Sequence, residues 1–439
     1  MRYADKRVLI IEDQRPFLLL LKGLLSSMGA TDVVTKPSAE QALMLCKKQR
    51  FDIIIADLHL GTDKKNGFEL IEELRIRKLL KPSTIFIIIS ADSARPVVLG
   101  SIERQPDDYI VKPFSQAQLK SRISRSWSKR QFMLPVFKAI ADDDWKEAGQ
   151  YCQQLMRAGS PYSRFCEQAL IDIYWHINQN QAALDILKKY ENGRPILWAH
   201  VALGKTYLKL GFWEDALRIG HEILQTNRFS ADAHDIMADA QNHMRESESA
   251  IDHIKLAIKL SPYSLPRHFN ACAIARDNDD FDLAAQSSLA IWELSKRTVH
   301  QNVFHWCGYI RSALDAAEFS DDKKKRNRYQ QDALLFMQRG KHDEILNRME
   351  QPFDYSIFES IIHARLNSQE GKMIEAKRHL LESQQAIDRT FEEYPETLAT
   401  DSIKVMFSLG EFEDAETVLG HLRKSDMELD PNTEYVIAR

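Results

Sequence analysis

The chain has 439 residues, a length that fits two to four domains of ordinary size and excludes a small peptide scaffold. Hydrophobic residues make up 44% and charged residues 28%, which excludes a chain disordered throughout, and the few glycines (16) and prolines (14) favour helices. Residues 1–127 carry 21 Lys+Arg and 15 Asp+Glu, net +6, while the remainder is net −10, which argues against nucleic-acid binding by that larger acidic part.

Residues 1–127 alternate short apolar runs with amphipathic segments. The runs are bounded by polar or turn residues and have the length of strands. Strands that alternate with helices predict a parallel sheet covered on both faces, with functional groups at the carboxyl ends of the strands. We therefore expect a doubly wound α/β domain with five parallel strands, at VLII (8–11), TDVVTK (31–36), DIIIA (52–56), IFIII (85–89) and DYIV (108–111), the second being the weakest.

Polar side chains follow four of these strands. Glu12 and Asp13 come after the first strand and Asp57 after the third. Because the ends of parallel strands converge, three carboxylates would repel one another unless a cation joins them, and hard oxygen ligands suit Mg²⁺. Ser90 after the fourth strand and Lys112 after the fifth add a hydroxyl and an ammonium group. This combination predicts a magnesium site that can hold a phosphoryl group.

This arrangement resembles the receiver domain of two-component response regulators, the CheY-like fold, over residues 5–125. The resemblance implies that Asp57 is the phospho-acceptor and that Glu12 and Asp13 bind Mg²⁺ directly or through water. It implies that the backbone carbonyl of His59 completes the metal shell while the His59 side chain is exposed. The implied reaction is nucleophilic attack by Asp57 on a phosphohistidine of a sensor histidine kinase.

The same resemblance implies three further roles beside the acceptor. Ser90 would hydrogen-bond a phosphoryl oxygen, and Lys112 would pair with another of its oxygens. The peptide bond between Lys112 and Pro113 would be cis. Tyr109, three residues before the lysine, stands at the position of the family's aromatic switch, which turns inward when the phosphorylated state forms.

Two segments depart from the receiver pattern. The loop LHLGTDKKNG (58–67) contains no proline and reaches Gly67 about two residues late, which affects the expected kinetics of phosphorylation rather than the identity of the acceptor. The segment SARPVVLGSIERQPDD (93–108) lacks the small residues common before the switch tyrosine. We expect its helix, the fourth of the domain, to be short or mobile.

After residue 127 the strand-like runs stop, and residues 128–439 form a succession of helical segments. Ala216, Ala250 and Ala284 are spaced 34 residues apart, the period of a helix–turn–helix repeat. A small side chain where two helices cross lets their backbones approach closely. About eight candidate turns recur, at ADDDWKEA (141–148), INQNQAAL (177–184), LGFWEDAL (210–217), MRESESAI (244–251), DNDDFDLA (277–284), GKHDEI (340–345), GKMIEA (371–376) and GEFEDA (410–415).

The small and aromatic residues of these units, such as Gly204, Tyr207 and Pro262, resemble the tetratricopeptide repeat (TPR), most closely over residues 197–298. The resemblance implies an all-α TPR superhelix, an α-solenoid, whose groove binds a protein or peptide partner. An irregular helical domain without a regular superhelix is the alternative. Residues 296–328 break the period, and they predict a longer helix and a polar loop.

Three other patterns have ordinary structural explanations. His300, His305 and Cys307 fall on different faces of a helix and lack a fourth ligand, so a metal site is not expected there. The run KKKR (323–326) directly follows two aspartates, which predicts a solvated loop rather than a nucleic-acid site. The aromatic residues of the repeats follow core positions; they are Trp198, Tyr207, Phe212 and Trp213.

The cysteines and the apolar runs indicate the cellular compartment in which the protein is expected. Five cysteines lie far apart with no two-residue spacing, so neither disulfides nor zinc are expected, and the compartment is expected to be reducing. The chain has no run of 18 apolar residues and no apolar core typical of a secretion signal near Met1. We expect a cytoplasmic protein without membrane insertion.

The expected function is therefore that of a response regulator, not an enzyme beyond its own phosphorylation and dephosphorylation. No DNA-reading helix, cyclic-nucleotide signature, kinase motif or hydrolase motif occurs in residues 128–439, so the output is expected to be protein binding. One alternative is a phosphoryl acceptor or competitor that tunes a histidine kinase. Another is a TPR adaptor that acts independently of phosphorylation. The sequence leaves homodimerisation open.

Overall fold

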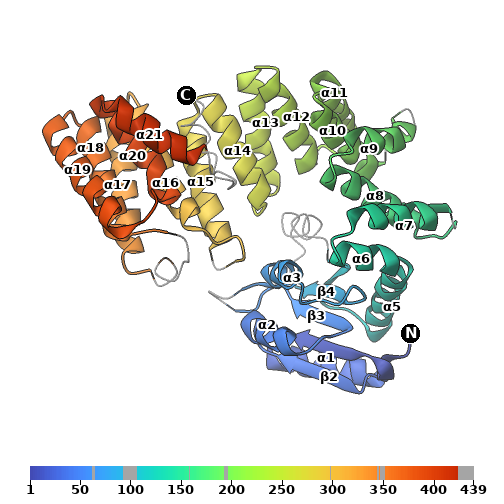
Figure 1. The fold of residues 1–439 in the computed structure, drawn as a ribbon. Helices are drawn as coiled ribbons and strands as arrows, with labels where there is room; N and C mark the ends of the chain where they lie inside the picture. Colours follow the sequence, from blue (N-terminus) through green and yellow to red (C-terminus); the bar gives the residue numbers. More distant parts are fainter. Residues whose placement is uncertain are drawn as a thin grey trace. The chain divides into compact units, whose positions relative to one another are not determined.

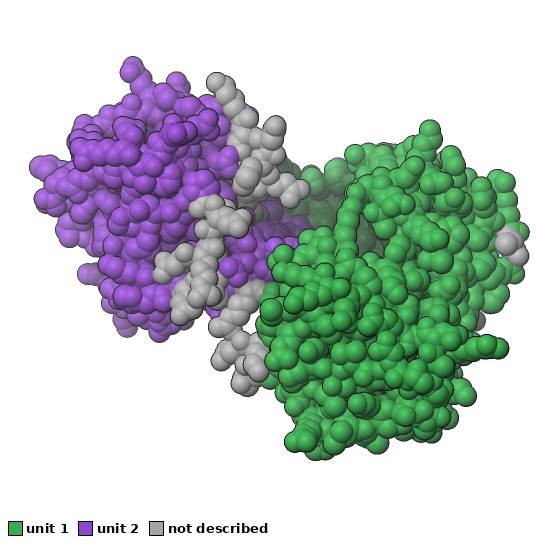
Figure 2. Space-filling view, turned by 60° about the horizontal axis from the view of Figure 1, so that its bottom comes forward, with its two compact units in different colours: residues 1–246, 256–264 green, residues 247–255, 265–439 purple. Residues whose placement is uncertain are grey.

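The computed structural model describes residues 1–61, 65–91, 106–157, 159–191, 196–296, 298–343, 346 and 352–423. By its internal contacts the chain divides into two compact units, which Figure 2 shows in different colours. Unit 1 comprises residues 1–246 and 256–264, and unit 2 comprises residues 247–255 and 265–439. The α/β domain and the first helical repeats therefore belong to the same unit.

Unit 1 begins with the predicted five-stranded sheet (Figure 1). A single 3₁₀ turn, Tyr3–Asp5, precedes it. The strands lie in the order β2-β1-β3-β4-β5, and every neighbouring pair is parallel. All five expected strands are confirmed, and they are β1 (Arg7–Ile11), β2 (Asp32–Lys36), β3 (Ile53–Asp57), β4 (Ile85–Ser90) and β5 (Asp108–Val111).

Four described helices cover the two faces of this sheet, namely α1 (Arg15–Ser27), α2 (Ala39–Lys48), α3 (Gly67–Ile76) and α5 (Gln116–Phe132). Because successive side chains of a strand point to opposite faces, each strand contributes to two cores. Leu9 and Phe86 pack with residues of α2 and α3. Ile10 and Ile87 pack with residues of α1 and α5. The sheet is thus buried on both sides, which explains the continuous apolar runs in the sequence.

The last helix of this fold leads directly into the helical region. At the start of α5, Ser115 and Gln118 form a capping box, in which each side chain accepts a hydrogen bond from the other residue's backbone N–H. The helix continues past the domain boundary expected after residue 127, so that boundary falls inside α5. The segment expected to form the fourth helix lies largely outside the described residues.

The remainder of the described chain is all helical, as predicted. None of its helices, nor those of the α/β domain, is both long and apolar enough to cross a membrane within the described ranges. The helices are α6 (Leu134–Ala141), α7 (Trp145–Arg157), α8 (Ser163–His176), α9 (Asn180–Leu187), the 3₁₀ turn Lys188–Tyr190, α10 (Leu197–Leu210), α11 (Trp213–Thr226), α12 (Ala231–His243), α13 (Ser247–Leu260), α14 (Leu265–Asp277), α15 (Phe281–Ser295), α16 (Val303–Glu318), α17 (Lys323–Gly340), α18 (Tyr355–Gln369), α19 (Met373–Thr390), α20 (Glu396–Leu409) and α21 (Phe412–Leu422).

The turns within the repeats share one backbone geometry. Each contains a residue in the left-handed region, with φ between 56° and 79°, followed by a residue whose N–H donates to a carbonyl five positions earlier, as Phe212 does to Tyr207. This hydrogen bond satisfies a carbonyl that the end of the helix would otherwise leave open, and it reverses the chain within a few residues. The left-handed residues are Asp143, Asn178, Gly211, Arg245, Asp279, Gly371 and Gly410, of which the first five are 33 to 35 residues apart. The helix–turn–helix repeat is therefore confirmed.

Small residues lie where paired helices cross. Ala216, Ala250 and Ala284, the residues that established the period, are all fully buried. A side-chain carbon added to Gly204 would lie 2.8 Å from a terminal carbon of Ile236 on the helix two elements further along. The repeat spacing in the sequence thus reflects close helix contacts.

Two details differ from the sequence-based expectations. The run KKKR is not a loop, because it forms the start of α17. The prediction that it is solvated is confirmed, and the prediction that it forms a loop is wrong. Asp322 accepts a hydrogen bond from the N–H of Lys324 and thereby starts this helix earlier than the charge pattern suggests. Phe212 was expected in the core, but 46% of its surface is exposed because it lies in the turn before α11. The turn predicted at residues 340–345 lies partly outside the described residues.

A network of buried charges connects four helices of unit 2. Asp315 on α16 accepts bonds from Arg276 at 2.9 Å and from Arg365 at 2.5 Å, and it also pairs with Lys404. Asp401 on α20 pairs with Arg365 at 3.2 Å. Burial alone would raise the pKa of the Asp315 carboxyl, but the surrounding cations hold that pKa well below its usual range. The members, none of them exposed, are Arg276, Arg311, Asp315, Arg365, Asp401 and Lys404.

Candidate functional site

The register of the sheet brings the predicted site residues to one edge. Ile11 lies beside Ala56, so Glu12 follows β1 next to the point where Asp57 ends β3. Ser90 ends β4 beside Val111 of β5, which places Lys112 directly after it. The backbone N–H of Lys112 donates to the carbonyl of Ser90 at 2.7 Å. The expected convergence of polar residues at the carboxyl edge therefore occurs.

Three carboxylates meet at this edge. Glu12, Asp13 and Asp57 each offer an oxygen atom, and these atoms lie within 4.8 Å of one another. It is the one such group of acidic, histidine or cysteine side chains among the residues that the structure describes. Glu12 and Asp57 are buried while Asp13 is exposed, so the cluster opens to solvent on one side. An oxygen-only donor set with room for water fits Mg²⁺.

Lys112 reaches into the carboxylate cluster. Its Nζ atom donates to Glu12 at 2.9 Å and to Asp57 at 2.5 Å. The same ammonium group lies 3.9 Å from the centre of the Phe17 ring, which meets Phe114 edge-on at 5.9 Å. Sequence reasoning did not single out these two aromatic residues. Their positions in the sequence could have indicated this contact, since Phe17 lies in the first turn of α1 and Phe114 directly follows Pro113.

The electrostatics of the cluster favour an added cation. The pKa of Glu12 is raised to about 7. Burial is the main cause and the nearby charge of Asp57 adds to it, while hydrogen bonds from Lys112 and from the N–H of Gln14 oppose the rise. One ammonium group therefore does not balance two buried carboxylates and their exposed neighbour. A divalent cation would supply the missing positive charge.

The backbone around Asp57 is closely packed. The N–H of His59 donates to Asp57 Oδ1 at 3.3 Å, and the His59 side chain is exposed, as expected. A side-chain carbon at Gly67 would lie 2.6 Å from the carbonyl oxygen of Asp57, so α3 can begin this close to the acceptor only with glycine. Asn66 caps the helix by accepting from the N–H of Phe68 at 2.9 Å. The metal-binding role of the His59 carbonyl stays a prediction.

The remaining predicted residues occupy β4, β5 and the turn that follows. Ser90 is fully buried at the end of β4, and the segment that follows it lies outside the described residues from position 92 to 105. Tyr109 on β5 is half-buried and packs against the core beneath α2 and α3. Its carbonyl accepts a hydrogen bond from Arg122 of α5 at 2.9 Å. The Lys112–Pro113 bond is cis, as expected.

The histidine-rich segment of the helical region does not form a second site within the described residues. His305 Nδ1 lies 2.9 Å from the Ser295 hydroxyl, and Cys307 is buried in the core of unit 2. His300 lies in the turn before α16. Among the described residues these side chains do not form a group of three metal ligands.

Comparisons with known proteins identify the α/β domain. A family model described as "Response regulator receiver domain" matches residues 8–124. The "Alkaline phosphatase synthesis transcriptional regulatory protein PhoP" of Bacillus subtilis (strain 168) is 30% identical over 139 residues, which are 32% of this chain and 55% of that protein. The chain thus spans about half the length of this relative.

Two solved structures resemble different parts of the chain. The receiver domain of sensor histidine kinase PA1611 from Pseudomonas aeruginosa PAO1, solved with a magnesium ion coordinated in its active site cleft, is 23% identical and has a TM-score of 0.25, covering 28% of this chain and 98% of that one. The thermophilic TPR protein TTC0263 of Thermus thermophilus is 16% identical and has a TM-score of 0.34, covering 47% of this chain and 99% of that one.

Proposed function

Because residues 8–124 are the receiver domain of a two-component response regulator, followed by a TPR-like helical region, we propose that Asp57 accepts a phosphoryl group and that this modification controls protein binding by the helices. The phosphodonor is a sensor histidine kinase. The observation that carries the proposal is the convergence of three carboxylates and Lys112 at one edge of the sheet.

The residues of the cluster divide the chemistry among them. A carboxylate oxygen of Asp57 attacks the phosphorus atom of the phosphohistidine, the P–N bond breaks, and the released imidazole takes up a proton from solvent. Lys112, already 2.5 Å from Asp57, stays beside the acceptor and offsets charge on the transferred group. Ser90 donates its hydroxyl to a phosphoryl oxygen.

Magnesium is the cofactor that the donor set favours. Glu12, Asp13 and Asp57, together with the backbone carbonyl of His59, would hold the ion. When bound, it supplies positive charge that the raised pKa of Glu12 indicates is lacking.

The connection between α5 and α6 supports transmission to the helical region. A single residue separates the two helices, and Arg130 of α5 binds Asp107, next to β5, through two bonds of 2.8 Å. The guanidinium group of Arg130 also lies 4.0 Å from the centre of the Phe137 ring on α6. A rearrangement of β5, where Tyr109 lies, would therefore act on the first helix of the repeats through one side chain.

The experiment treats the full chain with acetyl phosphate and Mg²⁺ and identifies the modified residue by mass spectrometry. Hydrogen exchange of α6 and α7 is then compared with and without beryllium fluoride, a phosphoryl mimic. We expect a modification of about 80 Da at Asp57 and a change in exchange beyond α5, both lost in Asp57→Asn and both retained in Asp5→Asn, which alters an exposed aspartate outside the site.

The outcomes separate the candidate functions. Modification with no change in the helices favours a phosphoryl acceptor that tunes a kinase. Absence of modification with every donor leaves a TPR-like adaptor that acts independently of phosphorylation. Either result overturns the proposed control of the helical region.

A further inference from the structure

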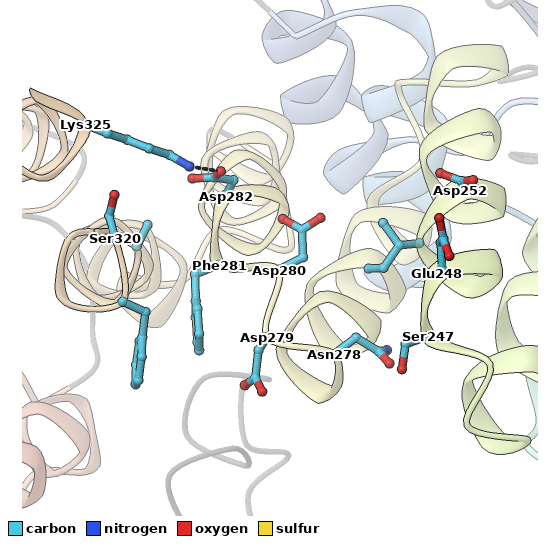
Figure 3. A pocket seen from close by; sticks show the side chains of 13 residues that line it. Ser247, Glu248, Asp252, Asn278, Asp279, Asp280, Phe281, Asp282, Ser320 and Lys325 are labelled. Atoms are coloured by element: carbon cyan, nitrogen blue, oxygen red, sulfur yellow. Dashed lines mark hydrogen bonds and ion pairs between the residues drawn. The ribbon is translucent and has the colours of Figure 1, made fainter. Parts of the chain in front are cut away.

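Unit 2 contains a cavity of about 440 Å³ along the edge formed by the turns of its repeats (Figure 3). Its walls come from the start of α13, the turn between α14 and α15, the end of α16 and the start of α17. The lining is therefore made by three consecutive helix pairs at the side where their turns lie.

The cavity has an apolar floor that is partly open to solvent. Phe281 and Phe319 stack with ring centroids 4.3 Å apart and planes inclined by 10°. Phe281 is buried, but 55% of the surface of Phe319 is exposed. Ile251 on α13 adds a half-buried aliphatic side chain. Exposed aromatic surface in a hollow is typical of a binding site.

The rim of the cavity is strongly acidic. Among the described residues, five carboxylates and one ammonium group, that of Lys325, line it, and Lys325 is paired with Asp282. Asp280 caps α15 by accepting from the N–H of Leu283 at 2.9 Å. The five carboxylates belong to Glu248, Asp252, Asp279, Asp280 and Asp282.

Helix stability explains only part of this charge. Acidic residues are favourable at a helix N-terminus, which accounts for Asp280, Asp282 and Glu248. Asp252 lies one turn further along α13, and it faces the like charge of Glu248 at a spacing that is mildly unfavourable. Within the described residues neither Glu248 nor Asp252 forms an ion pair, and both are exposed. The α13 wall therefore presents uncompensated negative charge across the cavity from the aromatic pair.

We propose that this cavity binds an arginine side chain of an extended segment of a partner protein. The guanidinium group would pair with Glu248 and Asp252 on α13, and an apolar side chain of the same segment would lie on the exposed ring of Phe319 across the cavity. An aliphatic neighbour in the segment would cover Ile251. The inference rests on the proposed role of the helical region in protein binding, and it places the contact on the turn edge of the repeats.

Two other occupants fit less well. A metal ion requires converging ligand atoms, and among the described residues only the cluster at Asp57 meets that condition. Nucleic acid would be repelled by the acidic rim and by the net −10 charge of residues 128–439.

The test selects binders from a random peptide library displayed on phage, using the full chain as bait. In parallel the bait is the variant Glu248→Gln/Asp252→Asn, and a second variant is Phe319→Ala. A matched control, Glu413→Gln/Asp414→Asn, removes the same two charges from exposed positions in the first turn of α21, away from the cavity. Selected peptides are then synthesised, and their affinities are measured by fluorescence polarisation at two salt concentrations.

We expect peptides rich in arginine next to aliphatic residues, with affinities that fall as salt rises. Each cavity variant should weaken binding roughly three- to tenfold, the effect of losing two exposed charge pairs or one aromatic contact, and the control variant should leave it unchanged. All altered side chains are exposed, so the variants should fold normally. The inference would be overturned if the selected peptides lacked basic residues, or if the cavity variants bound the peptides as tightly as the unmodified chain does.

The measurement is repeated with and without beryllium fluoride so that the two proposals can fail separately. If the cavity variants weaken peptide binding but the phosphoryl mimic does not change it, the proposed binding site is supported and the proposed control by the receiver is refuted. If the mimic changes hydrogen exchange in the helices but no basic peptide binds, control by the receiver is supported and the proposed binding site is refuted.

Discussion

The affinity for Mg²⁺ should fall steeply as the pH is lowered from 8 to 6. The metal and a proton compete for the carboxylate of Glu12, whose pKa is raised to about 7 chiefly by burial. Competition from a proton with this pKa raises the apparent dissociation constant of the metal above its value at high pH. The increase is about elevenfold at pH 6, about twofold at pH 7 and negligible at pH 8. The expected change between pH 6 and pH 8 is therefore about tenfold, or about 1.4 kcal/mol.

The stability of the metal-free protein should show the opposite trend. A carboxyl group whose pKa is raised on folding stabilises the folded state below its unfolded value of 4.5, and this contribution is lost as the pH rises through about 7. Added Mg²⁺ binds the ionised form, so the rise in melting temperature that it causes should be larger at pH 8 than at pH 6.

Isothermal titration calorimetry of the full chain with MgCl₂ at pH 6, 7 and 8 measures this effect. Titrations in buffers of different ionisation enthalpy should show the release of about 0.9, 0.5 and 0.1 protons per bound ion. In Glu12→Gln the affinity should be weaker and should no longer depend on pH. A change of less than twofold between pH 6 and pH 8 in the unmodified chain would refute the assignment of this pKa to a metal ligand.

Three other perturbations follow from the geometry. Gly67→Ala places a carbon against the carbonyl of Asp57, so it should cost roughly 1–3 kcal/mol of stability and slow phosphorylation by acetyl phosphate; an unchanged rate would contradict the close packing. Asp315→Asn removes the carboxylate that Arg276, Arg365 and Lys404 share. It should lower the stability of unit 2, measured by hydrogen exchange in urea, by about 3–5 kcal/mol, whereas a loss below about 1 kcal/mol would show that the network relaxes. Arg245→Gly should stabilise its turn by roughly 0.5–1 kcal/mol and Gly211→Arg should destabilise the equivalent turn by at least as much, since both positions have positive φ. Effects of the same sign would argue against backbone strain.

Much of the sheet and its site could be predicted from the sequence because both depend on local patterns. A strand buried on both faces reads as an unbroken apolar run, and the polar residue that follows it marks the carboxyl edge. Asp57 and Lys112 are 55 residues apart in the chain, yet a parallel sheet requires their strand ends to meet. The contact of Lys112 with Phe17 was not predictable in this way, because it depends on how the first turn of α1 lies over the sheet.

The repeats were predictable for a different reason. A left-handed residue is needed at each turn, and glycine marks it at Gly211, Gly371 and Gly410, but aspartate, asparagine or arginine occupies it elsewhere. The alanine spacing therefore identified the period more reliably than the turn residues did. The helical start of KKKR was missed because a run of lysines is unfavourable at a helix N-terminus, and the cap from Asp322 outweighs that penalty.

Two buried carboxylates of this chain show how the number of nearby cations distinguishes a structural ion pair from a site that can bind a metal. Asp315 is surrounded by three cations, which hold its pKa far below the ordinary range although burial opposes them, so it stays ionised and binds its helices together at any moderate pH. Glu12 has one ammonium partner and a second carboxylate beside it, so its pKa rises to about 7. Of the two, only Glu12 remains short of positive charge. A buried acidic site in that condition gains stability from an incoming cation, which is why the edge of the sheet, rather than the larger charge network in unit 2, is the place to expect magnesium.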